Sequence, residues 1–186
     1  MEMSGEFRIP AARDKVWAAL NDPEILQRSV PGCQSITRLS DTEMEGAVMA
    51  SIGPVKATFK GSVVLSDVNP PHSYTLTGQG KGGPAGFAKG VARVALTEEG
   101  GVTVLHYTAE ASVGGKLAQI GQRLIDGAAR KLSEEFFGNF STILGGEKSP
   151  AEVTAKAKTA PPGLRPIIWI PGLILIMAIM IMLFVL

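Results

Sequence analysis

Few side chains in this chain of 186 residues have the types and spacing that catalysis needs. The two histidines, His72 and His106, are not spaced as a pair of metal ligands. The single cysteine, Cys33, lacks the identifiable base that a catalytic thiol requires. Glu134 and Glu135 are adjacent on a predicted helix, so they do not share a face and cannot act as an acid–base pair. We therefore predict no catalytic residues, no bound metal and no enzymatic activity.

A glycine-rich stretch at residues 78–90, GQGKGGPAGFAKG, invites comparison with phosphate-binding loops. Such a loop works only when a helix follows, because the N-terminus of the helix binds the phosphate. Here a strand-like run follows, at residues 87–97. The sequence therefore predicts a hairpin loop, flanked by Lys81 and Lys89. This loop could cover a pocket or meet an acidic protein surface or anionic lipid headgroups.

The elements that position these side chains follow from the hydrophobic periodicity. Runs with period two, separated by short turn signals, predict antiparallel hairpins, and a run with helical spacing predicts a long C-terminal helix. We expect an α+β fold in which a curved antiparallel sheet of seven strands wraps that helix. The predicted strands are residues 3–9, 33–39, 42–52, 55–68, 73–80, 87–97 and 102–113, and the predicted helices are 13–20, 23–28 and 115–144.

Alternation within the strands indicates which face is buried, and many of its positions are Ala or Gly. Small residues on facing walls either let the helix approach closely or leave a cavity. A strongly curved sheet cannot follow a straight helix everywhere, so we favour an apolar cavity, with a tightly packed core as the alternative. Tyr107 would be its polar contact. The predicted ligand-binding wall is Phe59, Val63, Leu76, Val94, Leu105, Tyr107, Ile120 and Leu124.

The last 20 residues, 167–186, carry no charge. A helix of that length rises about 30 Å, which matches the hydrocarbon thickness of a bilayer, so we predict a transmembrane anchor. If the helix starts only at Pro171, about 24 Å remain, and an interfacial or re-entrant insertion is the alternative. The preceding stretch, 145–166, is rich in Pro, Ala and Lys and predicts a flexible linker. Residues 1–144 then form one domain.

Charge indicates where that domain lies. The formal net charge is +1 and the domain has no basic run, which argues against nucleic acid as a partner. Basic side chains precede the apolar segment and no charged side chain follows it, so the positive-inside rule predicts a domain facing the cytoplasm from the inner membrane. The basic residues are Lys148, Lys156, Lys158 and Arg165.

Three stretches carry a family resemblance. They are VWAALNDPEILQRSVPGC at residues 16–33, GPVKATFKGSVVLSDVNPP at 53–71 and GGKLAQIGQRLI at 114–125. With the order of elements, they make residues 1–144 resemble the START-like helix-grip fold and, more specifically, the family of the carbon monoxide dehydrogenase G-subunit. The apolar C-terminal segment is similar to that of membrane-anchored members.

The resemblance implies an accessory protein rather than an enzyme. It implies recruitment of a molybdenum hydroxylase of the carbon monoxide dehydrogenase type to the cytoplasmic membrane. An apolar cavity would suit a quinone, menaquinone or ubiquinone, that passes electrons to the respiratory chain. The alternatives are a docking or assembly factor without a ligand, a START-like lipid-binding protein of another pathway, and a START-like enzyme acting on an apolar substrate.

Overall fold

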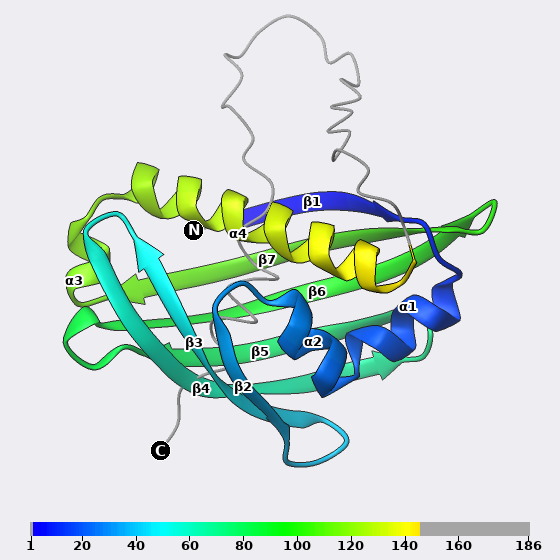
Figure 1. The fold of residues 1–186 in the computed structure, drawn as a ribbon, viewed down its shortest axis with the longest axis horizontal. Helices are drawn as coiled ribbons and strands as arrows, with labels where there is room; N and C mark the ends of the chain where they lie inside the picture. The colour runs from blue at the N-terminus through cyan, green and yellow to red at the C-terminus, as the bar shows by residue number, and fades with distance from the viewer. Residues whose placement is uncertain (1, 146–186) are drawn as a thin grey trace, which may run out of the picture.

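One antiparallel sheet of seven strands organises residues 2–145, the part of the chain that the computed structural model describes (Figure 1). The strand order β1-β7-β6-β5-β4-β3-β2 places β1 and β2 at opposite edges. Successive hairpins build the sheet from β2 to β7, and β1 pairs with β7. The predicted fold class of this part is confirmed. The strands are β1 (Glu2–Ile9), β2 (Cys33–Arg38), β3 (Glu43–Ile52), β4 (Val55–Asn69), β5 (Ser73–Lys81), β6 (Phe87–Glu99) and β7 (Val102–Gly114).

Two short helices, α1 (Arg13–Leu20) and α2 (Pro23–Ser29), connect the edge strands β1 and β2. Helix α2 begins where the sequence predicts, because Asp22 caps it. Oδ1 of Asp22 accepts hydrogen bonds from the backbone N–H groups of Glu24 at 2.9 Å and Ile25 at 3.3 Å. Pro23 occupies the first helical turn, where the N–H that it lacks would have no partner within the helix.

The C-terminal helix is interrupted, so the prediction of one continuous helix over 115–144 is wrong. The chain forms a single turn, α3 (Lys116–Gln119), and then the long helix α4 (Gln122–Ile143). Between them Gly121 has φ +91°, a conformation that other residues rarely adopt and that ends the helical hydrogen-bond pattern.

The break also changes which face of α4 is buried. A continuous helix would bring Leu117 and Leu124 onto one stripe, but the phase is reset at Gly121. Leu124 is 52% exposed, and Ile125 takes the buried position of that turn. The prediction that Leu124 faces the interior is therefore wrong. The buried side chains of α4 are Ile125, Ala129, Ser133, Phe136, Phe137 and Phe140.

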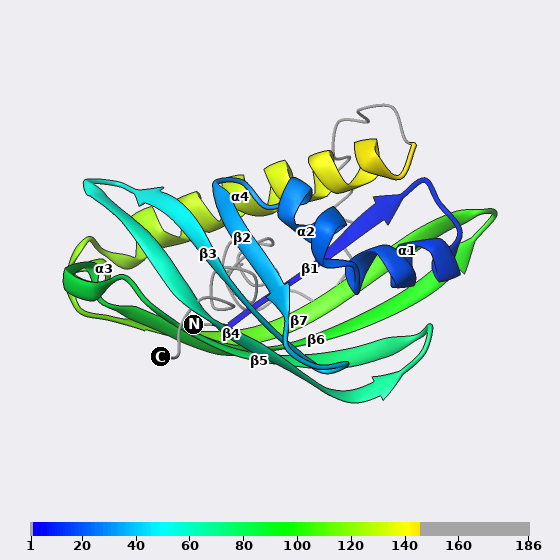
Figure 2. The ribbon, with the colours of Figure 1, turned by 60° about the horizontal axis from the view of Figure 1, so that its bottom comes forward.

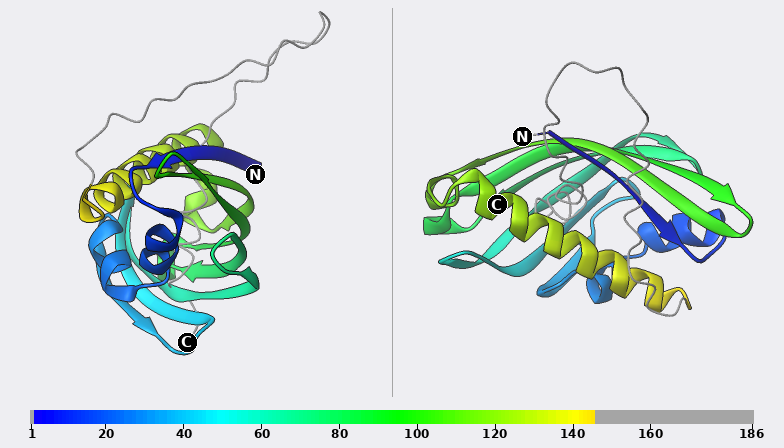
Figure 3. Two further views of the ribbon diagram at one scale, coloured as in Figure 1. Left: turned by 90° about the vertical axis from the view of Figure 1, so that its right-hand side faces the viewer. Right: turned by 90° about the horizontal axis from the view of Figure 1, so that it is seen from above.

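Helix α4 crosses the concave side of the sheet (Figure 2), and the strands curve round the interior when seen end-on (Figure 3). Its close backbone contacts are mainly with α2, and with β1 and β3 near the two edges of the sheet. It makes fewer with the central strands β4–β7. The backbone of the helix therefore comes closest to α2, and its buried side chains share one core with those of the central strands.

Aromatic side chains hold the C-terminal half of α4. The rings of Phe7 in β1 and Phe137 in α4 stack with their centroids 3.7 Å apart. Phe136 packs edge-on against Phe137 at 5.0 Å and stacks with Phe140 at 5.6 Å. We call Phe7, Phe136, Phe137 and Phe140 the aromatic clamp. Such pairs add about 0.5–1.5 kcal/mol each to the gain from burial, so the clamp fixes the helix against the edge strand.

The predicted inner faces of the strands are confirmed. In β4 the side chains from Phe59 to Leu65 alternate between buried and exposed as expected. In β7 the exposed His106 and Glu110 alternate with the buried Leu105, Tyr107, Ala109 and Ala111.

Within residues 2–145 no helix is long and apolar enough to cross a membrane. The predicted transmembrane segment, 167–186, lies outside the described residues, as does the linker after Gly145. Both stay predictions.

We expect Phe137→Ala to lower the free energy of unfolding by about 3–5 kcal/mol, because it removes the stack on Phe7 and leaves a cavity in the clamp. Phe87→Ala is the matched control, since Phe87 is 46% exposed, and it should cost less than about 1 kcal/mol. Urea unfolding of the full chain measures both variants. Equal, small losses would contradict the role of the clamp.

Candidate ligand-binding site

Small residues line the inner face of the central strands in laterally aligned rows. Gly61 lies opposite Gly80, which lies opposite Ala88, and Ala92 lies opposite Ala109 in the pairing of β6 with β7. Sequence alternation predicted the small inner positions, but their side-by-side alignment follows only from the register. We call this set the small-residue belt: Gly61, Gly78, Gly80, Ala88, Gly90, Ala92, Ala109 and Ala111.

The belt lies on the concave side of the sheet, the side that helix α4 crosses. If α4 packed directly on Gly and Ala, the two backbones would come closest there, because no bulky side chain would separate them. The closest backbone approach of α4 is instead to α2. The aromatic clamp sets this position at the other end of the interior. The belt residues themselves contribute little side-chain volume to the core, because all of them are Gly or Ala.

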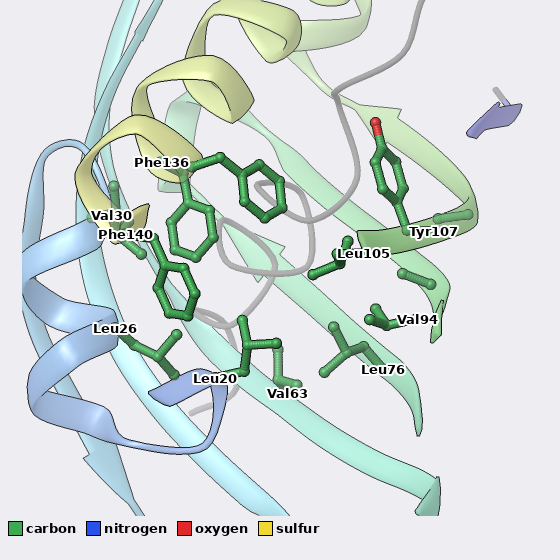
Figure 4. Close-up of a cluster of buried hydrophobic side chains, with 14 of the residues drawn as sticks. Leu20, Leu26, Val30, Val63, Leu76, Val94, Leu105, Tyr107, Phe136 and Phe140 are labelled. Atoms are coloured by element: carbon green, nitrogen blue, oxygen red, sulfur yellow. The ribbon is translucent and has the colours of Figure 1, made fainter. Parts of the chain in front are cut away.

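Six of the eight residues predicted to line a ligand site are buried on the inner face. They come from β4, β5, β6 and β7 and are at most 9% exposed. Ile120, half-buried, is the C-cap residue of α3, and Leu124 is exposed near the β3–β4 turn at Gly53. The side chains of the sheet and of α4 converge on the interior in Figure 4. The six residues are Phe59, Val63, Leu76, Val94, Leu105 and Tyr107.

Tyr107 supplies a polar group next to the belt. Its ring lies over Gly5 of the paired strand β1, where an added Cβ would come within 2.5 Å of the phenol oxygen. In Figure 4 that oxygen points away from Leu105 and Val94. The residue is 3% exposed, and within residues 2–145 its Oη has no hydrogen-bond partner. Burial raises the pKa of Tyr107, so the phenol keeps its proton and remains able to donate.

Ser133 of α4 is a second polar group in the interior, and the sequence analysis did not identify it. It is 1% exposed, and no group in the described part of the chain makes a hydrogen bond with its Oγ. Two other helical hydroxyls donate to the carbonyl four residues earlier: Ser29 to Ile25 at 2.7 Å, and Thr142 to Gly138 at 2.8 Å. Ser133 differs from both, which makes it a candidate ligand contact.

The other candidate groups lie elsewhere. His72 is exposed, with Nδ1 3.0 Å from Nη1 of Arg13, and His106 is exposed 3.6 Å from Glu6. Burial raises the pKa of the Cys33 thiol, which disfavours the reactive thiolate. In the described part of the chain no group of three or more His, Cys, Asp or Glu side chains could hold a metal ion.

The glycine-rich stretch forms the loop between β5 and β6, with one 3₁₀ turn (Gly83–Ala85), and the strand β6 follows it. Lys81 lies opposite Lys60 of β4 on one side and opposite Phe87 of β6 on the other, and Lys89 lies opposite Gln79. The strand ends beside the loop therefore present an exposed basic outer side that includes one aromatic residue. The loop lacks the following helix that a phosphate site needs.

Comparison with known proteins agrees with this architecture. Residues 5–145 match the profile of a family described as the G-subunit of carbon monoxide dehydrogenase (CoxG). A solved structure of a conserved protein from Geobacillus kaustophilus is 32% identical, with 78% of this chain and 95% of that chain covered and a TM-score of 0.73. A START superfamily protein from Mycobacterium smegmatis is 13% identical, with 77% and 97% covered and a TM-score of 0.61, a likeness of fold alone. The curated proteins include no match.

The two buried tyrosines make stability depend on alkaline pH. Burial raises the pKa of both Tyr74 and Tyr107 above the value of about 10 in an unfolded chain. Above pH 10 the unfolded chain loses phenol protons that the native state retains, so stability is unaffected below that pH and falls above it. We expect the melting temperature to fall above about pH 10, and to fall less steeply in Tyr74→Phe and Tyr107→Phe. Because the chain has two tyrosines in all, an unchanged alkaline slope in the double variant would contradict this.

Proposed function

Since this chain belongs to the CoxG family of carbon monoxide dehydrogenase, we propose that it is an accessory protein that binds an apolar ligand, a quinone, beside a membrane. In this proposal it serves a molybdenum hydroxylase of the carbon monoxide dehydrogenase type. The quinone takes electrons from that enzyme to the respiratory chain, and the protein carries out no chemistry itself.

The observation that carries the ligand proposal is the small-residue belt under a helix held at its sides. Protein interiors are normally filled to the density of organic crystals, and small residues on a wall are normally compensated by close approach of the opposite element. Here the close approaches of α4 are mainly elsewhere. A flat ring or prenyl chain is the kind of molecule that would complete the packing. Each CH₂ that it buries contributes about 0.8 kcal/mol.

The membrane part of the proposal rests on the predicted linker and anchor. A flexible chain of 22 residues, 145–166, spans about 26 Å on average, and its prolines extend it further. A domain on such a tether can reach both the bilayer surface and an enzyme bound nearby. Tethering also raises its effective concentration near a lipid-soluble ligand.

Ala92 and Ala109, which face each other across β6 and β7, test the ligand role. In a filled interior, changing either to Leu would overpack the core and cost about 1–3 kcal/mol. In a protein that carries a ligand on the belt, we expect both variants to keep close to wild-type stability and to lose the ligand. Thermal unfolding of delipidated protein and mass spectrometry of lipids extracted from protein purified in mild detergent measure the two effects.

Ala95→Leu is the matched control, because Ala95 lies in the same strand with its side chain exposed on the outer face. This variant should change neither the melting temperature nor the amount of lipid extracted with the protein. Absence of any quinone above the background of a control membrane protein would refute the ligand. Destabilisation by both inner variants, with no ligand found, would identify a docking protein with a filled interior.

Removal of residues 167–186 tests the membrane role. We expect the full chain to sediment with membranes, and the shortened chain to remain in the supernatant, because the removed segment holds the apolar residues that favour the bilayer. Fractionation followed by immunoblotting measures this. If the shortened chain still sediments in high salt, the anchor lies in another part of the protein.

A further inference from the structure

Two buried hydroxyl groups without partners point to the place where the polar end of a ligand binds. The inference rests on the proposed ligand role and extends it to an orientation. A buried hydroxyl that makes no hydrogen bond costs free energy, so native structures rarely keep one unless a water or ligand completes it. The described residues include three side chains with such an atom, at Tyr107, Ser133 and Arg13. The first two belong to the interior face of β7 and of α4.

Aromatic contacts bring the two hydroxyls to the same side of the interior. Phe7 of β1 stacks with Tyr107 at 6.2 Å and with Phe137 of α4 at 3.7 Å. Ser133 lies four residues before Phe137, so the two side chains share one face of the helix. Tyr107 and Ser133 are therefore both neighbours of the Phe7–Phe137 stack, from opposite walls.

Arg130 adds a positive charge at this point. It lies three residues before Ser133, on the same side of α4. Its charge acts on the phenol of Tyr107 and partly offsets the effect of burial on that pKa. Among the residues described, no carboxylate forms an ion pair with Arg130. The surroundings of the two hydroxyls therefore favour an electron-rich oxygen and disfavour a cation.

Apolar residues surround this polar point on the sheet. Across the strands, Tyr107 is paired with Val94 of β6, which is paired with Tyr74 of β5. Two residues closer to α3, the inward pair is Ala92 and Ala109 of the belt. A ligand whose polar end reaches Tyr107 and Ser133 would therefore lay its apolar part across the belt. That direction leads away from the aromatic clamp and toward the loop between β5 and β6.

We propose that Tyr107 Oη and Ser133 Oγ donate hydrogen bonds to one oxygen-bearing end of an otherwise apolar ligand, whose remaining length lies on the small-residue belt. The oxygen is a carbonyl of a quinone or a carboxylate of a fatty acid, which share the ability to accept these bonds. Tyr107 and Ser133 fix the orientation, and the belt supplies the apolar contact.

Three probes with alkyl chains of nine or ten carbons separate these contributions: a decyl-substituted benzoquinone, decanoate and decylbenzene. Each is titrated calorimetrically into the full-length protein at one fixed detergent concentration, so that partitioning into micelles cancels between variants. We expect wild-type protein to bind the quinone or decanoate at least about 10-fold more tightly than decylbenzene, the ratio for two hydrogen bonds. If Arg130→Gln weakens the binding of decanoate but not that of the quinone, the site binds a carboxylate.

Tyr107→Phe and Ser133→Ala should each lower the affinity for the oxygen-bearing probe about 2- to 10-fold. The affinity of each variant for decylbenzene should stay within about twofold of the wild-type value. The controls are Tyr74→Phe, a buried tyrosine in the same row, and Ser29→Ala, a buried serine whose hydroxyl already has a partner. Neither control should alter the ratio of the affinities for the oxygen-bearing probes and for decylbenzene. Without ligand, Tyr107→Phe and Ser133→Ala should melt at or above the wild-type temperature, whereas Ser29→Ala should melt below it.

The outcomes separate the orientation from the ligand role. Equal binding of all three probes to the wild type, or unchanged quinone and decanoate affinity in both variants, overturns the orientation and leaves the ligand role intact. A clear loss of melting temperature in both ligand-free variants also overturns it, because the hydroxyls would then have structural partners. Failure of every probe to bind overturns the proposed ligand role itself.

Discussion

The stack of Phe7 on Phe137 controls the rest of the interior, because it determines where helix α4 lies. With the ring centroids 3.7 Å apart, the helix is tied to the edge strand β1, and its contact with α2 fixes it from the other side. Because close-packed cores cannot deform continuously, a helix fixed at its sides cannot also descend onto Gly and Ala in the middle. The proposal that a ligand completes the core rests on this constraint.

If the core binds a ligand as we propose, stability and function are in opposition within it. The aromatic clamp stabilises the core by packing. The small side chains of the belt contribute less packing, and the buried hydroxyls of Tyr107 and Ser133, which have no partner among the described residues, cost free energy. A sequence optimised for stability alone would place larger side chains at Ala92 and Ala109 and an apolar group at Ser133. Sites that depart from good local packing are where function is expected to reside. The departures here occur together, on facing walls of one interior, whereas the Asp22 cap of α2 follows the ordinary rule.

The sequence predicted the strands and their buried faces well, because alternation reports directly on burial. It also identified Tyr107 as the polar residue of the inner face. It did not reveal the break at Gly121, since a glycine within a helical pattern is tolerated as often as it interrupts, and Leu124 was therefore assigned to the wrong face. Ser133 was missed because a serine between apolar helix positions resembles an ordinary polar residue. The alignment of Gly61 with Gly80 depends on strand register, which turn lengths set and composition does not show.

The polar end of the ligand has particular weight if the ligand comes from a membrane, as we propose. The apolar chain of a quinone gains about 0.8 kcal/mol per CH₂ on leaving water, whether it enters a bilayer or the belt. These gains nearly cancel when it moves from one to the other, however long the chain is. The difference must then come from groups that lipid tails cannot provide. Two hydroxyls in a dry interior are such groups, because a carbonyl in the hydrocarbon layer has no hydrogen-bond donor at all. The chain length would set how strongly the ligand avoids water, while Tyr107 and Ser133 would set whether it prefers the protein to the bilayer.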